Sequence, residues 1–164
     1  MEIYKELEKN LELITKEDYR HWNLSTNTKK ILCDIGLPKE PFSFIQFNIE
    51  EIENIKLDEE HIIIGTDFGT SICINSKEEI VSIDQENEYP NRFINKDLET
   101  FLEFILFFLS YENKINNATD DEIGQIIKEI KQEFHKMDRK ALSGEENWWS
   151  VLLEQIEEVS IGYE

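Results

Sequence analysis

Residues 61–84, HIIIGTDFGTSICINSKEEIVSID, decide the fold of this 164-residue chain. The stretch holds three runs rich in β-branched residues, at 61–65, 71–75 and 79–84. Ile72 and Ile74 alternate with polar or small neighbours, which is typical of a strand with one face buried. The turns between the runs are too short to hold a crossover helix, so the sequence predicts an antiparallel meander.

Two further segments extend this sheet. The aromatic run 42–47, FSFIQF, is typical of a strand covered on both faces. Residues 92–94 form a candidate fifth strand. The last run of the meander, 79–84, places Ile80 and Ser82 on one face and Val81 and Ile83 on the other.

Helical periodicity occurs on both sides of the predicted strands. Before them, apolar spacing predicts helices at 3–14 and 28–35, the second ended by Gly36 and Pro38. After them, three helices are expected: from a cap at Asn95 or Asp97 to about 111, from a cap at Thr119 to about 137, and over 145–159. The fold class is therefore α+β, a central curved antiparallel sheet flanked by N-terminal and C-terminal helices. We expect one domain over 1–164, in which 119–164 is a C-terminal helical extension.

The charge excludes several classes of partner. Asp and Glu number 36 against 17 Lys and Arg, a formal net charge of -19 that is spread along the whole chain. Nucleic acid and anionic membrane surfaces need clustered cations, so neither is an expected partner. The charge serves either solubility or electrostatic steering towards a basic partner.

Residues that report on compartment and chemistry are few. Cys33 and Cys73 have no metal spacing and are expected as buried thiols in a reducing compartment. The N-terminus has no signal-peptide pattern, and the most apolar stretch, 101–109, is too short to span a bilayer, so a cytoplasmic protein is expected. The three histidines are far apart in the sequence and form no zinc motif. The sequence therefore predicts no metal, no cofactor and no catalytic site.

One motif supports an alternative function. Residues 64–71, IGTDFGTS, resemble the first phosphate loop of the actin, Hsp70 and sugar-kinase ATPases, in which an Asp and a Gly-Thr hairpin meet nucleotide and metal. The chain is too short for the two lobes of those ATPases, which favours an ordinary glycine-flanked hairpin. The nucleotide-binding alternative uses residues 65–70, with Asp67 at their centre.

Two aromatic pairs have open roles. Trp148 and Trp149 are adjacent in a predicted helix, and either could anchor the core or contact a partner. Tyr19 and Trp22 lie in an early connection, where aromatic residues more often make contacts.

Several motifs in order carry a family resemblance. They are IGLP at 35–38, the strand 42–47, the hairpin from 64 to 75, RFIN at 92–95 leading into a helix, MDRKAL at 137–142, and the tryptophans at 148–149. This arrangement resembles the SUKH immunity-protein superfamily, closest to the subfamily with an extra C-terminal helical segment. The resemblance implies a bacterial cytoplasmic protein without enzymatic activity that binds and neutralises a polymorphic toxin, often a nuclease. It names no toxin-contacting residue in this chain.

The acidic sheet region is the predicted partner-binding surface. Its candidate residues are Asp67, Phe68, Glu78, Glu79, Asp84, Glu86, Glu88 and Tyr89. They lie in turns and strand ends, where a scaffold presents contacts. The competing surface is 145–164, which contains acids and no Lys or Arg. A monomer or weak dimer is expected, and a housekeeping scaffold of the same fold is the remaining alternative.

Overall fold

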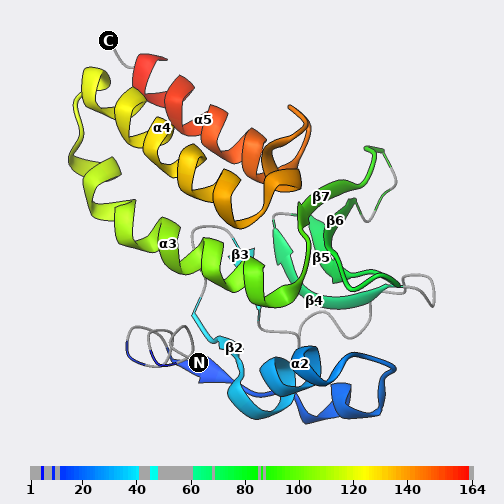
Figure 1. Cartoon of the computed structure of the whole chain (residues 1–164). Coiled ribbons are helices and arrows are strands. Elements are labelled where there is room, and N and C mark those ends of the chain that lie inside the picture. The colour runs from blue at the N-terminus through cyan, green and yellow to red at the C-terminus, as the bar shows by residue number, and fades with distance from the viewer. Residues whose placement is uncertain are drawn as a thin grey trace.

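The computed structural model describes Lys5, Lys9 and residues 12–40, 45–47, 61–67, 69–84, 86 and 88–162. Within them the chain forms one five-stranded antiparallel sheet in the order β3-β4-β5-β6-β7 (Figure 1). Its strands are β3 (Ile45–Gln46), β4 (Ile62–Asp67), β5 (Thr70–Ile74), β6 (Ile80–Asp84) and β7 (Arg92–Asn95). Each strand pairs with the next one along the chain, so the predicted meander and the α+β class are confirmed, and Arg92–Asn95 is the fifth strand.

The two faces of the sheet follow the alternation in the sequence. Ile72, Ile74 and Ile80 join the main hydrophobic core, which the helices share. Cys73, Val81 and Ile83 form a small cluster of their own. Cys33 and Cys73 are free and buried, as expected. Of the predicted strand 42–47, Ile45–Gln46 is a strand, and residues 42–44 lie outside the described residues.

The N-terminal segment differs from its prediction. Leu13–Ile14 is a strand, β1, that pairs with β2 (Leu37–Pro38), so the expected helix 3–14 is wrong at its end. Pairing with β2 gives the backbone groups of Leu13 and Ile14 hydrogen-bond partners, which residues at the end of a helix would lack. The rest of that expected helix lies outside the described residues except Lys5 and Lys9.

The second helix begins earlier than predicted. It runs as α2 (Thr26–Lys29), capped by the Ser25 hydroxyl, and continues as a π-helical turn, η2 (Lys30–Ile35). A short 3₁₀ helix, η1 (Glu17–His21), precedes it. Gly36 ends the segment at φ +103°, and a Cβ there would lie 2.8 Å from the backbone of Ile14. The glycine is thus required both by backbone conformation and by close packing.

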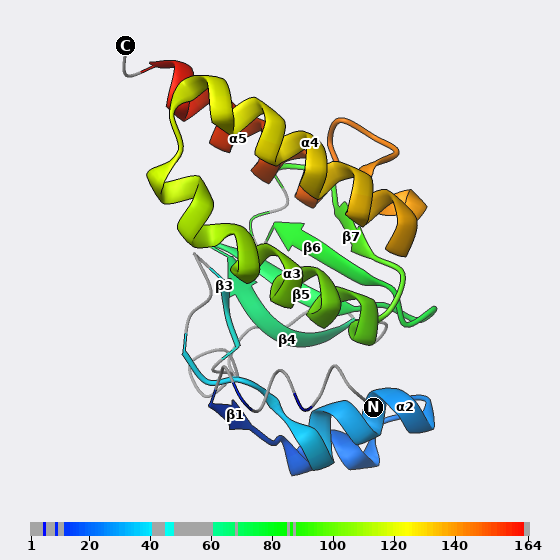
Figure 2. The same ribbon diagram turned by 60° about the vertical axis from the view of Figure 1, so that its left-hand side comes forward.

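Three helices follow the sheet: α3 (Leu98–Asn117), α4 (Asp120–Met137) and α5 (Trp148–Gly162), with a 3₁₀ turn, η4 (Arg139–Leu142), before α5. Of the two candidate caps, Asn95 and Asp97, it is Asp97 that caps α3, and Thr119 caps α4 as predicted. α3 extends beyond residue 111, and α5 begins at Trp148. α3 crosses one face of the sheet, and α4 and α5 lie side by side next to it (Figures 1 and 2). The segment with α2 lies at the other end of the molecule from α4 and α5 (Figures 1 and 2), and the following turn η2 contributes Ile31 and Leu32 to the main hydrophobic core.

A buried polar network joins β7 to the C-terminal helices. The Asn95 amide donates to Asp138 Oδ2 at 3.1 Å, and its oxygen accepts from Trp149 Nε1 at 2.9 Å. The backbone N–H of Lys96 also donates to Asp138 Oδ2, at 2.8 Å. Asn95, Asp138 and Trp149 are all buried, so these bonds determine how η4 and the start of α5 dock on the sheet.

Both tryptophans at the start of α5 belong to the core. Trp149 is fully buried among Phe104, Phe108 and Phe134, and Trp148 is 5% exposed with its ring at right angles to that of Trp149. The packing therefore makes both rings core anchors, and Trp148 also lines a cavity at the edge of the core.

Candidate functional site

The predicted partner-binding residues lie at two opposite ends of the sheet. The register pairs Thr70 with Asp84 at one end of β5 and β6, and Ile74 with Ile80 at the other. Asp67, Asp84, Glu86, Glu88 and Tyr89 belong to the first end, and Glu78 and Glu79 belong to the second. At about 3.3 Å per residue, the strands separate the two groups by more than ~13 Å. Phe68 lies outside the described residues.

Glu78 makes contacts within the protein. Its carboxylate accepts from the Ser25 backbone N–H at 3.1 Å and from the Thr28 hydroxyl at 2.6 Å. Partial burial opposes ionisation, but these hydrogen bonds outweigh it and lower the pKa of Glu78. Glu78 thus ties the β5–β6 turn to the start of α2.

Glu79 is engaged in the same way. It accepts from the Asn75 amide at 3.1 Å and from Lys140 Nζ at 3.0 Å. Burial again opposes ionisation, and the hydrogen bonds from Asn75 and Lys140 outweigh it and lower the pKa of Glu79. Lys140 also lies 4.3 Å from the centre of the Phe93 ring, so this pair connects the turn to η4 and β7.

The described residues Glu86, Glu88 and Tyr89 of the loop between β6 and β7 are exposed. The Asp84 carboxylate accepts from three backbone N–H groups, those of Glu86, Glu88 and Tyr89, at 3.0–3.1 Å. Glu86 and Glu88 are exposed, and Tyr89 is 65% exposed. Asp84 therefore orders the loop, while the two glutamates and the tyrosine remain accessible to a partner.

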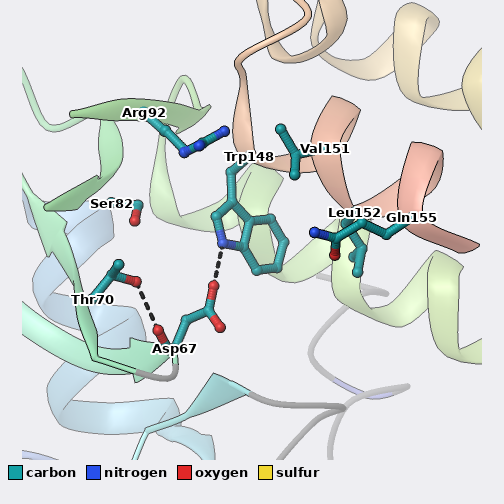
Figure 3. A pocket seen from close by; sticks show the side chains of 8 residues that line it. All are labelled: Asp67, Thr70, Ser82, Arg92, Trp148, Val151, Leu152 and Gln155. Atoms are coloured by element: carbon teal, nitrogen blue, oxygen red, sulfur yellow. Dashed lines mark hydrogen bonds between the residues drawn. The ribbon is translucent and has the colours of Figure 1, made fainter. Parts of the chain in front are cut away.

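Asp67 is half-buried and faces α5. Its Oδ2 accepts from Trp148 Nε1 at 2.6 Å, and its backbone oxygen accepts from the Thr70 hydroxyl at 2.8 Å (Figure 3). Burial raises the pKa of Asp67, with the Trp148 hydrogen bond and the charge of Arg92 acting in the opposite direction. The carboxylate lines a cavity of about 330 Å³ between the end of the sheet and α5.

The glycines of the hairpin that resembles a phosphate loop are required by its packing and backbone conformation. A Cβ at Gly65 would lie 2.7 Å from the backbone oxygen of Gln46, so the glycine lets β3 approach β4. Gly69 adopts φ +92° in the tight turn between Asp67 and Thr70. Because Asp67 is bound to Trp148, the geometry favours a hairpin over a nucleotide site.

The competing acidic surface borders the same end of the sheet. Glu145, Glu146, Glu154 and Glu158 are exposed on α5 or just before it. Arg92 of β7 donates to the backbone oxygen of Glu146 at 3.0 Å and lies 3.5 Å from its carboxylate. The two surfaces that the sequence offered as alternatives are thus connected through Arg92.

Three polar residues of the cavity were missed by sequence reasoning: Ser82, Arg92 and Gln155. Ser82 had a signal, because it is a polar residue on the core-facing side of its predicted strand. Arg92 was noted only as part of a family motif, and Gln155 had no signal. Their common position depends on the docking of α5 on the sheet, which no local pattern encodes.

The described part of the chain holds neither a cluster of metal ligands nor a membrane-spanning helix. Its His, Cys, Asp and Glu side chains form no group of three or more that could hold a metal ion. None of its helices is long and apolar enough to cross a membrane.

Comparison with known proteins identifies a family. A family model described as SUKH-4 immunity protein matches residues 8–155, which is most of the chain. No curated protein and no solved structure matches. The matched region contains the whole sheet, α3, α4 and the first half of α5.

Proposed function

Because the chain belongs to the SUKH-4 immunity protein family, it is a toxin-neutralising immunity protein, and we propose that it binds its toxin through an acidic surface. That surface consists of the β6–β7 loop, with Glu86, Glu88 and Tyr89, together with Glu145 and Glu146 just before α5. The observation that carries the proposal is the loop ordered by Asp84, which holds two glutamates and an aromatic ring exposed to solvent.

The chemistry of such a surface favours a nuclease-type toxin. A nuclease needs a basic groove to bind phosphates, and carboxylates on a rigid loop can take the place of those phosphates. The chain carries a net charge of -19, so opposed potentials would raise the association rate by one or more orders of magnitude at low salt. In this mechanism inhibition requires only occupation of the groove, with no chemical step by the immunity protein.

The position of Tyr89 adds an anchor to the charged loop. Tyr89 and Trp22 are the large hydrophobic residues exposed among the described residues. Tyrosine is enriched at the centre of protein interfaces because it buries a large area with few rotatable bonds. Glutamates around it would provide steering, whereas the ring would contribute to the lifetime of the complex.

Charge reversal in the loop tests the proposal. The partner is the cognate toxin, and the measurement is surface plasmon resonance at several salt concentrations. The double variant Glu86→Lys/Glu88→Lys should slow association on the order of ten-fold at low salt and flatten the salt dependence. Tyr89→Ala should mainly speed dissociation.

A matched control separates local from global charge. The double variant Glu40→Lys/Glu112→Lys changes two exposed acids elsewhere and shifts the net charge equally, from -19 to -15, because each replacement adds two positive charges. It should bind nearly as the wild type does. Equal weakening by both double variants, or none by either, would show that this acidic surface is not the toxin contact.

A further inference from the structure

The cavity between the sheet and α5 has a polar side on the sheet and a mixed polar and apolar side on α5. It is lined by Asp67, Thr70, Ser82, Arg92, Trp148, Val151, Leu152 and Gln155 (Figure 3). The sheet contributes the carboxylate, the two hydroxyls and the guanidinium. α5 contributes the indole of Trp148, the aliphatic side chains of Val151 and Leu152, and the amide of Gln155. With a volume of about 330 Å³, the cavity has room for one large side chain.

Two polar atoms in this cavity lack hydrogen-bond partners within the described residues. Ser82 is 3% exposed, and its hydroxyl makes no hydrogen bond there. Asp67 Oδ2 accepts from Trp148, but Oδ1 accepts from no described group. A buried hydroxyl and a half-buried carboxylate oxygen are costly to leave unsatisfied, so both favour a ligand that brings donors.

The charges around the cavity favour a cation at its Asp67 end. The Arg92 guanidinium extends towards the segment before α5, where it meets the backbone oxygen and the carboxylate of Glu146. In Figure 3 it lies at the end of the cavity opposite Asp67. Asp67 and Glu146 together outnumber Arg92, so the net local charge is negative. The raised pKa of Asp67 fits the same reasoning, because burial leaves its charge poorly compensated.

We propose that the cavity receives an arginine side chain of the toxin, whose guanidinium donates to Asp67 Oδ1 and to the Ser82 hydroxyl. Its aliphatic stem would lie against Trp148, Val151 and Leu152. Arginine fits better than lysine because its planar head has several donors at fixed angles and is more weakly hydrated. The inference rests on the proposed function, and it adds a specificity pocket beside the acidic surface.

A small probe tests the pocket without the toxin. Trp148 Nε1 donates directly to Asp67, so its indole NMR signal reports on that carboxylate. The chain has three tryptophans, and the signals of Trp22 and Trp149 serve as internal references. Titration with N-acetyl-argininamide should shift the Trp148 signal saturably in the millimolar range. The uncharged isostere N-acetyl-citrullinamide should bind at least ten-fold more weakly.

Two variants assign the contacts. Asp67→Asn keeps an acceptor for the Trp148 indole and removes the charge, so arginine affinity should fall at least ten-fold. Ser82→Ala should reduce the affinity several-fold. The control Glu112→Gln removes one exposed acid of α3 and should leave arginine binding unchanged.

The outcomes also separate this inference from the proposed function. No saturable shift at Trp148, equal binding of the citrulline probe, or unchanged affinity in Asp67→Asn would overturn the pocket. If toxin binding still depends on Glu86 and Glu88 in that case, the proposal that the acidic surface contacts the toxin stands. In the converse case, arginine binds in the cavity as expected while the loop variants leave toxin binding unchanged. That result would refute the proposed acidic surface and leave the pocket standing.

Discussion

The buried Asn95 amide is the most informative position for testing how the C-terminal helices dock. Replacement by leucine, Asn95→Leu, keeps a similar volume and removes both of its side-chain hydrogen bonds. The bonds lost are those to Asp138 Oδ2, at 3.1 Å, and from Trp149 Nε1, at 2.9 Å. Since Asn95 and Trp149 are fully buried and Asp138 is 4% exposed, solvent cannot replace them.

The expected cost follows from the groups left behind. The Trp149 N–H loses its acceptor, and Asp138 keeps the Lys96 backbone donor but loses the amide. The orphaned N–H costs about 1–3 kcal/mol and the lost hydrogen bond to the Asp138 carboxylate about 1.5–3 kcal/mol, so the variant should lose about 2.5–6 kcal/mol. That is a large share of the ~5–15 kcal/mol that stabilises a typical domain.

Urea denaturation followed by far-UV circular dichroism measures this loss. A double-mutant cycle with Trp149→Phe isolates the indole contribution, because the phenyl ring has no N–H to leave unpaired. The double variant should be less destabilised than the sum of the single variants by about 1 kcal/mol or more. The exposed control Asn117→Ala should change the stability by no more than about 0.5 kcal/mol. A loss below about 1 kcal/mol for Asn95→Leu, or strict additivity, would refute this account of docking.

Two other substitutions test the sheet and its contact with α2. Glu78→Ala should cost about 1 kcal/mol at pH 7, because it removes the acceptor for Thr28. The pKa of Glu78 is lowered in the folded state, so its stabilising contribution is fully present above its unfolded pKa and is lost as the pH falls through its folded pKa. The difference in stability between wild type and Glu78→Ala should therefore disappear below about pH 4. A difference that stays constant in pH-dependent melting would contradict this reasoning. Gly65→Ala should destabilise by about 1–3 kcal/mol, since its Cβ would meet the Gln46 backbone oxygen at 2.7 Å. The control Gly124→Ala, in open space on α4, should stabilise by up to about 1 kcal/mol in the same melting assay, and a shared sign for the two changes would refute the steric argument.

Local patterns predicted the sheet well because a meander pairs neighbours in the chain. The alternation at Ile72 and Ile74, with Gly69 in the turn before them, was enough to set strand order and core face. Helix caps were equally readable, since Asp97 and Thr119 act on backbone groups three residues away. The prediction was wrong at Leu13–Ile14, whose conformation depends on pairing with a strand more than twenty residues later.

The sequence predicted the acidic character of the candidate site but not which of its residues lie together. Its composition identified acidic turns, and the resemblance identified an immunity family that the family model confirms. The predicted partner-binding surface grouped Glu78 and Glu79 with Asp84, although the register places them at opposite ends of the strands. Acidic residues look alike in a sequence whether they cap a helix, pair with Lys140 or face solvent.

The sequence by itself determined the hairpins, the caps, the family and the negative charge, because each depends on neighbouring residues or on the chain as a whole. Only the tertiary structure decided which carboxylates remain exposed and where the cavity lies. Asp67 and Trp148 are 81 residues apart, yet their hydrogen bond turns a supposed surface acid towards α5. Such a contact arises from the docking of a helix on a sheet, a packing outcome with no period or motif in the chain.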